Sequence, residues 1–143
     1  MDHLAIMKKS WKLLPKILSG EKTIESRWYK NRVSPWGKIK KGDKVYFKDS
    51  GEPIMAMAEV FDVLEFSELN SAIVKKILVK YGAQDGIEKK EISKYYELFK
   101  DKNYCLLIFL RNPKRIIPFE IDKKGFGLMS AWITVNNISQ IKK

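Results

Sequence analysis

The chain of 143 residues carries a formal net charge of +11 and contains 45% hydrophobic and 12% aromatic residues. This length suits a single domain, residues 1–143, that buries about 70% of its unfolded surface, and the apolar content excludes wholesale disorder. Because the sequence has no long apolar run and no signal-peptide pattern at its start, we expect a cytoplasmic protein that does not contact a membrane.

The first half of the chain predicts a helix followed by three strands. Residues 8–19 show a helical pattern in which Pro15 suits the first turn, and Gly20 suits the position just past the helix end. A loop with Pro35 and Gly37 separates the first strand from a hairpin. The predicted strands are 23–29, 44–48 and 54–66.

The second half predicts two helices and then further strands. Ser67 is the expected N-cap of the first helix. Asn112 and Pro113 are expected to end the most apolar strand, and the next segment is expected to be an edge strand because Pro118 cannot donate to a sheet. The predicted segments are a helix at 88–99 and strands at 103–111, 116–121 and 131–135. This order predicts an α+β fold, a small mixed β-barrel with flanking helices.

Positive charge is concentrated near the amino terminus. Residues 1–48 hold 13 Lys and Arg against 4 Asp and Glu, whereas the remaining residues hold 15 against 13. Charge segregated in this way is typical of a surface that faces a polyanion. A merely solvated, lysine-rich surface is the alternative interpretation.

The single cysteine and the single histidine exclude several kinds of site. Cys105 lies in an apolar run, so we interpret it as a buried hydrophobic residue and not as a reactive thiol. His3 lies near a terminus that we expect to be frayed. We therefore predict no metal, no other cofactor and no Ser-His-Asp triad.

The most informative stretch is residues 20–27, which read Gly-Glu-Lys-Thr-Ile-Glu-Ser-Arg. In an extended segment Glu25 and Arg27 point to the same side, with Lys22 at the mouth. Beside Trp28, these charges predict a site for an anion or a nucleobase. The alternative is that Glu25 and Arg27 form an internal ion pair and that Lys22 is an exposed lysine of an edge strand.

This stretch also carries a resemblance. The pattern Gly-x-Lys-x-x-Glu-x-Arg, the Lys-Gly-Asp turn at 41–43 and the apolar strand at 56–63 resemble the ASCH domain (activating signal cointegrator homology), a β-barrel family related to the PUA RNA-binding fold. The later half of the chain matches only in outline. The resemblance implies an ASCH-type, PUA-like domain whose cleft, between barrel and helices, binds RNA through the motif's Lys, Glu and Arg.

We therefore interpret the chain as an RNA- or nucleotide-binding domain with a basic cleft, and leave its oligomeric state open. Unpaired bases stack on aromatic rings while cations hold the backbone. Core packing is the alternative for any one ring, and Trp36 is the ring that we expect outside the core. The candidate ligand-binding residues are Lys22, Glu25, Arg27, Trp28, Trp36, Lys48, Ser50, Arg111, Ser130 and Trp132.

Two further functions stay open. Some small ASCH proteins are amidohydrolases that remove the acetyl group from acetylated cytidine or deoxycytidine nucleosides, through a Lys, a Thr and a distant Glu. Lys22 matches the Lys, but Glu25 stands where the Thr is expected, so catalytic roles for Lys22 and Glu25 apply only if the chain is an enzyme. The possible replacements are Ser26, Ser50 or Ser130 for the hydroxyl, and Glu59 or Glu65 for the distant acid. The other function is a reader of a modified base or nucleoside, with a pocket formed by Trp28, Trp36 and Trp132.

Overall fold

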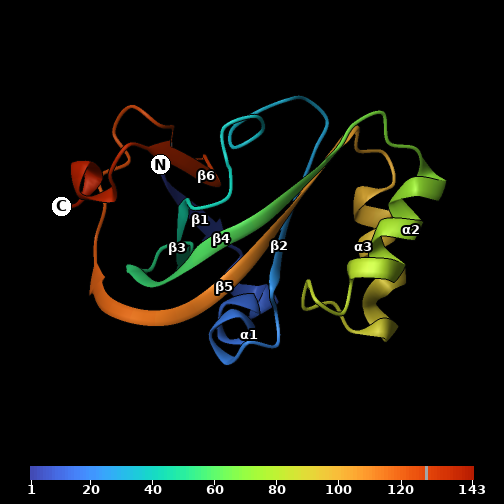
Figure 1. Cartoon of the computed structure of the whole chain (residues 1–143), viewed down its shortest axis with the longest axis horizontal. Coiled ribbons are helices and arrows are strands. Elements are labelled where there is room, and N and C mark those ends of the chain that lie inside the picture. The colour runs from blue at the N-terminus through green and yellow to red at the C-terminus, as the bar shows by residue number, and fades with distance from the viewer. Residues whose placement is uncertain (128) are drawn as a thin grey trace.

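A six-stranded sheet, in the order β2-β5-β4-β3-β1-β6, forms the centre of the molecule (Figure 1). The structure is a computed structural model in which residues 1–127 and 129–143 are described. The strands are β1 (Asp2–Met7), β2 (Ile24–Tyr29), β3 (Lys44–Asp49), β4 (Ile54–Phe66), β5 (Tyr104–Phe119) and β6 (Trp132–Val135). The helices are α1 (Leu13–Ser19), α2 (Ser71–Tyr81) and α3 (Ile92–Phe99), with 3-10 turns η1 (Lys9–Trp11), η2 (Lys89–Glu91) and η3 (Ile138–Ile141).

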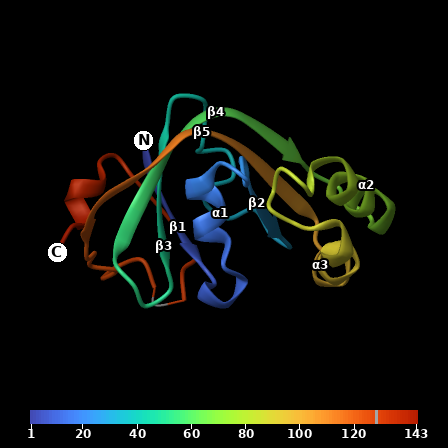
Figure 2. The same cartoon turned by 90° about the horizontal axis from the view of Figure 1, so that it is seen from below.

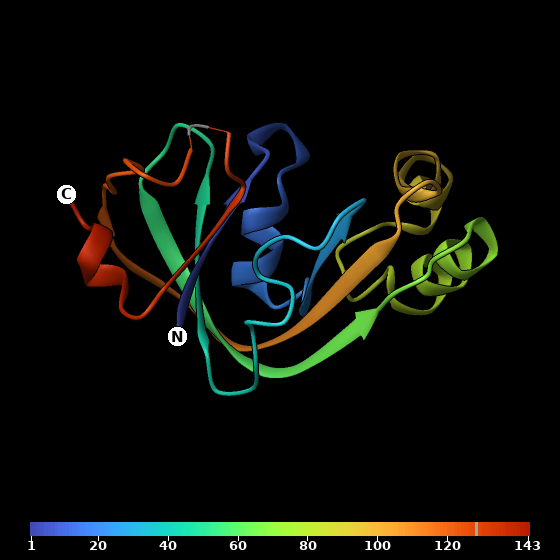
Figure 3. The same cartoon turned by 90° about the horizontal axis from the view of Figure 1, so that it is seen from above.

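The two longest strands, β4 and β5, bend the sheet into a half-barrel. Their antiparallel register shifts three times between Ile54 and Asp62, and such bulges increase the local twist and bend a strand. In Figures 2 and 3 the two strands form one continuous arc, α1 lies on its concave side, and α2 and α3 lie side by side at one end. This is the mixed α+β arrangement with flanking helices that the sequence predicts.

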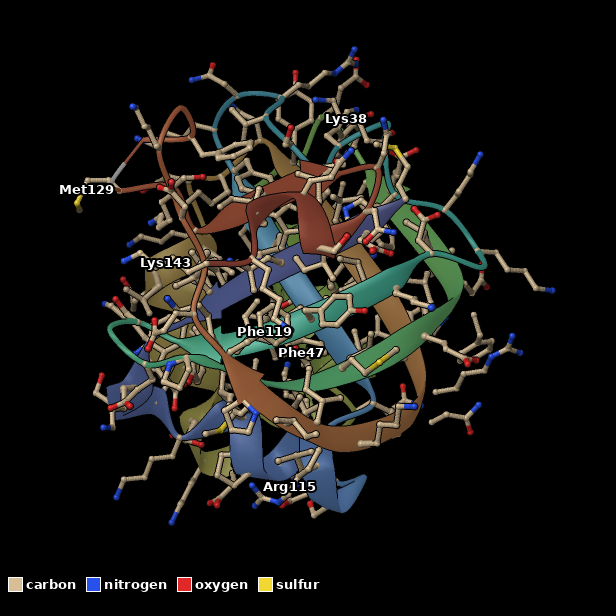
Figure 4. All side chains as sticks on the ribbon, turned by 90° about the vertical axis from the view of Figure 1, so that its left-hand side faces the viewer. Lys38, Phe47, Arg115, Phe119, Met129 and Lys143 are labelled. Atoms are coloured by element: carbon tan, nitrogen blue, oxygen red, sulfur yellow. The ribbon has the colours of Figure 1, made fainter. Side chains whose placement is uncertain are left out.

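Helices cover the sheet through separate apolar clusters. Leu14 and Ile17 of α1 pack with Phe47 inside the curl, and Figure 4 looks into this curl from the end opposite α2 and α3. A second cluster joins Leu78 of α2 and Tyr95 of α3 to the outer part of the sheet. None of the described helices is both long and apolar enough to span a bilayer.

The expectation of a frayed amino terminus is wrong. β1 lies inside the sheet, parallel to β3 and antiparallel to β6. His3 is completely buried there, and its Nε2 lies 2.8 Å from Oδ2 of Asp43. The apolar run after His3 is short, but strands pair with it on both sides, and this pairing holds the segment in the sheet.

The helix starts also differ from the prediction. In the first helical segment, Lys12 adopts a left-handed conformation that separates η1 from a shorter α1, although Pro15 does occupy the first turn of that helix. The cap of α2 is Asn70 and not Ser67, because the Asn70 side chain accepts a hydrogen bond from the backbone N–H of Ile73. The predicted N-cap at Ser67 therefore lies three residues before the observed one.

The predicted break at Asn112 and Pro113 is wrong, since β5 continues to Phe119. Asn112 has a positive φ of 52° within a strand whose register is irregular. β2 begins at Ile24, opposite Phe109, so beyond Leu110 the described strand that pairs with β5 is β4. Pro113 and Pro118 therefore lie on an edge, where a missing N–H is tolerated.

The residues after β6 pack against the rest of the protein, although their polar composition does not indicate this. Ile138 and Ile141 of η3 are buried against Leu4 and Ile133. Ile121 forms an antiparallel bridge with Lys142. The carboxyl-terminal residues therefore cover the end of the half-barrel that lies opposite α2 and α3.

Candidate functional site

Lys22, the central lysine of the motif, is buried and not exposed at a mouth or on an edge strand. Only 2% of its surface is accessible. Its Nζ donates to the carbonyl oxygens of Ile24 (2.6 Å) and Asp85 (2.7 Å) and to Oδ1 of Asp85 (2.5 Å). The three ammonium hydrogens are therefore used inside the protein, and none is left for a phosphate.

Asp85 lies in the turn after α2, and this turn is tied to the start of β2. The backbone N–H groups of Thr23 and Ile24 both donate to the carbonyl of Gln84. Gly86 has a φ of +78°, and a Cβ at this position would lie 3.2 Å from Cδ of Lys22, so glycine leaves room for the lysine stem. Asp85 was not among the predicted site residues, although the Asp85-Gly86 pair, which ends four residues after Gly82, is a turn signal.

The Asp85 carboxylate also joins Lys22 to the hydroxyl of Ser26. Ser26 Oγ donates to Oδ2 of Asp85 at 2.5 Å, and Nε1 of Trp28 donates to Ser26 Oγ at 3.1 Å. Burial raises the pKa of the Asp85 carboxyl, and the charge of Lys22 opposes that shift. The buried charges are thus paired and hydrogen-bonded, as buried charges must be.

Glu25 and Arg27 form a looser pair beside this cluster. Glu25 is 4% exposed, with Oε1 lying 3.7 Å from Nζ of Lys22 and Oε2 lying 3.9 Å from Nη2 of Arg27. Both distances allow charge attraction but exceed hydrogen-bond range. Glu25 Oε2 and Arg27 Nε are buried and have no hydrogen-bond partner among the described residues.

Arg27 connects the two edges of the sheet, β2 and β6, across a gap that we call the seam. Its Nη1 lies 3.4 Å from the carbonyl oxygen of Ala131, and its guanidinium lies 5.0 Å from the ring centroid of Trp132. A cation over an indole face is attracted by the ring quadrupole. The curl of the sheet thus brings its first and last strands together, which strand order alone does not predict.

Trp132 is oriented in turn by His3. Its Nε1 lies 3.2 Å from Nδ1 of His3, and because an indole N–H can only donate, Nδ1 must accept. His3 therefore carries its proton on Nε2, toward Asp43. Burial lowers the pKa of His3, although Asp43 opposes the shift, and a neutral ring agrees with this hydrogen-bond pattern. The sequence around His3 carries no signal of this support.

A cleft of about 300 Å³ opens along the seam beside β2. Trp11, Trp28 and Phe99 line it with aromatic rings, and Glu25 and Arg27 provide charged groups. Trp28 and Phe99 are stacked, with centroids 4.7 Å apart and planes 5° apart. A cavity of about 40 Å³ adjoins the cleft and reaches the side chains of Lys22 and Asp85. The cleft thus places aromatic side chains next to charged groups, a combination that can contact a flat, partly polar group.

A second pocket of about 470 Å³ lies on the other side of the seam. It shares Tyr29 and Ala131 with the cleft and is also lined by Lys38, Ser130 and Trp132. Of the predicted site residues, the cleft and the two neighbouring spaces therefore bring together Lys22, Glu25, Arg27, Trp28, Ser130 and Trp132.

The other four predicted site residues lie elsewhere. Trp36 is half-buried and packs against the buried core inside the curl without being part of it. Lys48 is buried in β3 and Ser50 lies in the exposed turn after it. Arg111 is paired with Glu59 on the surface at 3.1 Å. None of the four lines the cleft or the second pocket.

The acids suggested as partners for an enzyme are also not at the site. Glu59 pairs with Arg111, and Glu65 accepts from the backbone N–H of Gly37. The acids that lie beside Lys22 are Asp85 and Glu25. Among residues 1–127 and 129–143, no group of three His, Cys, Asp or Glu side chains could hold a metal ion.

Comparison with solved structures finds proteins that share this fold. No family model and no curated protein sequence matches the chain. The ASCH protein of Zymomonas mobilis matches in structure with a TM-score of 0.68 and 14% identity, covering 99% of this chain and 96% of that chain. A tyrosine-to-phenylalanine variant of that protein matches with a TM-score of 0.69 and 14% identity, covering 97% and 93%.

The N-terminal domain of McrB from Staphylothermus marinus is a more distant match, with a TM-score of 0.52 and 16% identity, covering 83% of this chain and 76% of that chain. At these identities the similarity concerns the fold. The chain has the fold of the ASCH domain, and the resemblance predicted from the sequence is confirmed at that level.

Proposed function

We propose that this chain binds single-stranded RNA and holds one unpaired base in the cleft along the seam. The observation that carries the proposal is the composition of this cleft, in which Trp11, Trp28 and Phe99 surround the charged pair of Glu25 and Arg27. Aromatic rings bind bases by stacking, which contributes about 1–3 kcal/mol per base. A volume of about 300 Å³ is at the lower end of ligand pockets and suits one nucleoside.

The second pocket supports a polymer as the ligand. It begins where the cleft ends, at Tyr29 and Ala131, so a neighbouring nucleotide would enter it directly. Lys8 lines the cleft and Lys38 lines the second pocket. These exposed cations are placed to contact the phosphates on either side of the bound base, and the net charge of +11 favours the approach of a polyanion.

Lys22 has a structural role in this proposal. Its ammonium is completely used by Asp85 and Ile24, so it holds the floor of the cleft together and does not contact the ligand. Lys8, Lys38 and Arg27 are the cations that the ligand meets. The variants that test binding are changes at Lys8 and Arg27, which line the cleft itself.

The test is fluorescence anisotropy of a labelled ten-nucleotide RNA at two salt concentrations. We expect the Lys8→Gln variant to weaken binding and to reduce the salt slope by about 0.7, the value for one lost phosphate contact on a single strand. Arg27→Gln should also weaken binding. Lys75→Gln, which changes an exposed lysine of α2 away from the cleft, is the matched control. Undetectable or salt-independent binding would contradict the proposal.

A second candidate is hydrolysis of an acetylated cytidine nucleoside, which one observation favours. The hydroxyl of Ser26 lines the cleft and donates to Asp85, whose other oxygen accepts from Lys22. Asp85 could take the Ser26 proton while the Ser26 oxygen attacks the acetyl carbon, and return it to the amine of the base as the C–N bond breaks. Water would then hydrolyse the acetyl ester on Ser26 and release acetate. Release of acetate from acetylcytidine that is lost in Ser26→Ala would establish this activity, and no release by the wild type would reject it.

A reader of a modified base would use the same cleft. The adjoining cavity of about 40 Å³ offers room for a small added group on a base. The test is a thermal shift with matched modified and unmodified nucleosides. A shift confined to one modified nucleoside would favour a reader over general RNA binding.

A further inference from the structure

Glu25 has hydrogen-bonding capacity that the protein leaves unused. Its carboxylate is 4% exposed, lines the cleft, and lacks a hydrogen-bond partner at Oε2 among the described residues. The nearest cations, Lys22 and Arg27, lie 3.7 and 3.9 Å away, beyond hydrogen-bond range, so neither donates to it. A buried acceptor without a donor costs free energy, and a ligand that supplies N–H groups would recover it.

Arg27 places a donor beside this acceptor. Glu25 and Arg27 are two residues apart in β2, so their side chains lie on the same face of the strand. Arg27 Nε also has no hydrogen-bond partner in the described chain. A ligand edge that meets the pair therefore finds a carboxylate acceptor next to a guanidinium donor.

We propose that this pair selects guanine as the base held in the cleft, an inference that rests on the proposed RNA binding. The guanine edge presents two adjacent donors, the ring N1–H and the 2-amino group, which a carboxylate accepts together. The neighbouring 6-oxo group of guanine accepts from Arg27. Glu25 is thus a specificity-determining residue.

The other bases match the pair less well. Uracil has one ring N–H between two carbonyl oxygens, and at least one of these oxygens would face the carboxylate. Cytosine and adenine place an acceptor ring nitrogen beside their amino group, so only one oxygen of Glu25 could be satisfied. Sites that hydrogen-bond a ligand group discriminate strongly against an analogue that lacks it.

The test uses labelled RNA pentamers that differ only in the central base: guanine, inosine or uracil in a run of uridines. Inosine lacks only the 2-amino group of guanine. We expect the guanine pentamer to bind at least about tenfold more tightly than either of the others. In the Glu25→Gln variant this difference should fall below about threefold. Glu21→Gln, an exposed glutamate in the same motif, is the matched control and should keep the full difference.

The outcomes separate this inference from the proposed function. Equal binding of all three pentamers by the wild type would overturn the selection of guanine and leave RNA binding intact. Absence of binding to any pentamer would overturn RNA binding itself. If Glu25→Gln does not fold, the comparison of guanine with inosine on the wild type decides alone.

Discussion

Replacing Lys22 by methionine should destabilise the protein strongly. Methionine fills much the same volume as the lysine stem, which packs against Gly86, but it cannot donate. Lys22→Met would leave the carboxylate of Asp85 buried without its cation, and the carbonyl oxygens of Ile24 and Asp85 without their donor. The perturbation therefore removes the pairing and little of the packing.

The expected loss at pH 7 is about 3–5 kcal/mol, the usual cost of removing one partner of a buried ion pair. An independent estimate agrees with this figure. Without Lys22, Asp85 would take up a proton in the folded state, and neutralising a carboxyl of ordinary pKa at pH 7 costs about 4 kcal/mol. At pH 5 the same protonation costs only about 1.5 kcal/mol, so the effect of Lys22→Met should be smaller in acid.

The assay is urea denaturation followed by tryptophan fluorescence, at pH 7 and pH 5, for wild type and Lys22→Met. The double variant Lys22→Met, Asp85→Asn is the control, because it removes the stranded charge and should recover part of the loss. A loss below about 1 kcal/mol at pH 7, or an equal loss at both pH values, would refute the buried pair. If the pair were refuted, Lys22 would be free to contact the ligand, and RNA binding by a Lys22 variant would test that contact. In this structure Lys22 makes no such contact, so its variants test stability and not ligand binding.

Three further predictions concern other parts of the fold. Gly86→Ala should cost at least about 1 kcal/mol more in urea denaturation than Gly51→Ala, because both have positive φ but only position 86 crowds Lys22; equal costs would contradict this contact. His3 is the only histidine, and burial holds its pKa below 6.5, so the unfolded state binds the proton first and the free energy of unfolding should fall as the pH drops from 6.5 to 5. A flat profile over that range would show that His3 titrates normally. Cys105 is buried and its thiol pKa is raised by burial, so a thiol reagent should label it slowly until urea is added; rapid labelling of the native protein would show that the strand opens.

Elements marked by local signals could be predicted from the sequence. The bounds 54–66 agree with β4, and the turn before it needs Gly51 at positive φ. Gly20 likewise ends α1 in the left-handed conformation that its position predicts. Alternating or continuous apolar runs between such turn residues specify strands within a few residues.

The environment of the motif could not be predicted, because its partners are distant in sequence. Lys22 and Asp85 are 63 residues apart, and His3 and Asp43 are 40 apart. Charged residues are seldom fully buried unless paired, so without knowledge of the partner the sequence favours an exposed Lys22. The burial of His3 could not be predicted for the same reason. The residues next to it in the sequence do not show that strands pair on both sides of it.

The half-barrel explains why the charges of one short motif have different roles. A barrel closed by backbone pairing would have no gap, but here β2 and β6 are the outer strands of the sheet and meet through Arg27 and Trp132. Lys22 lies just before β2 and faces the turn after α2, where it pairs with Asp85 inside the protein. Residues within β2 face the seam, where Arg27 reaches the opposite edge. Glu25 lies between them, attracted by two charges but hydrogen-bonded to neither, so its carboxylate, like Nε of Arg27, is left available to a ligand.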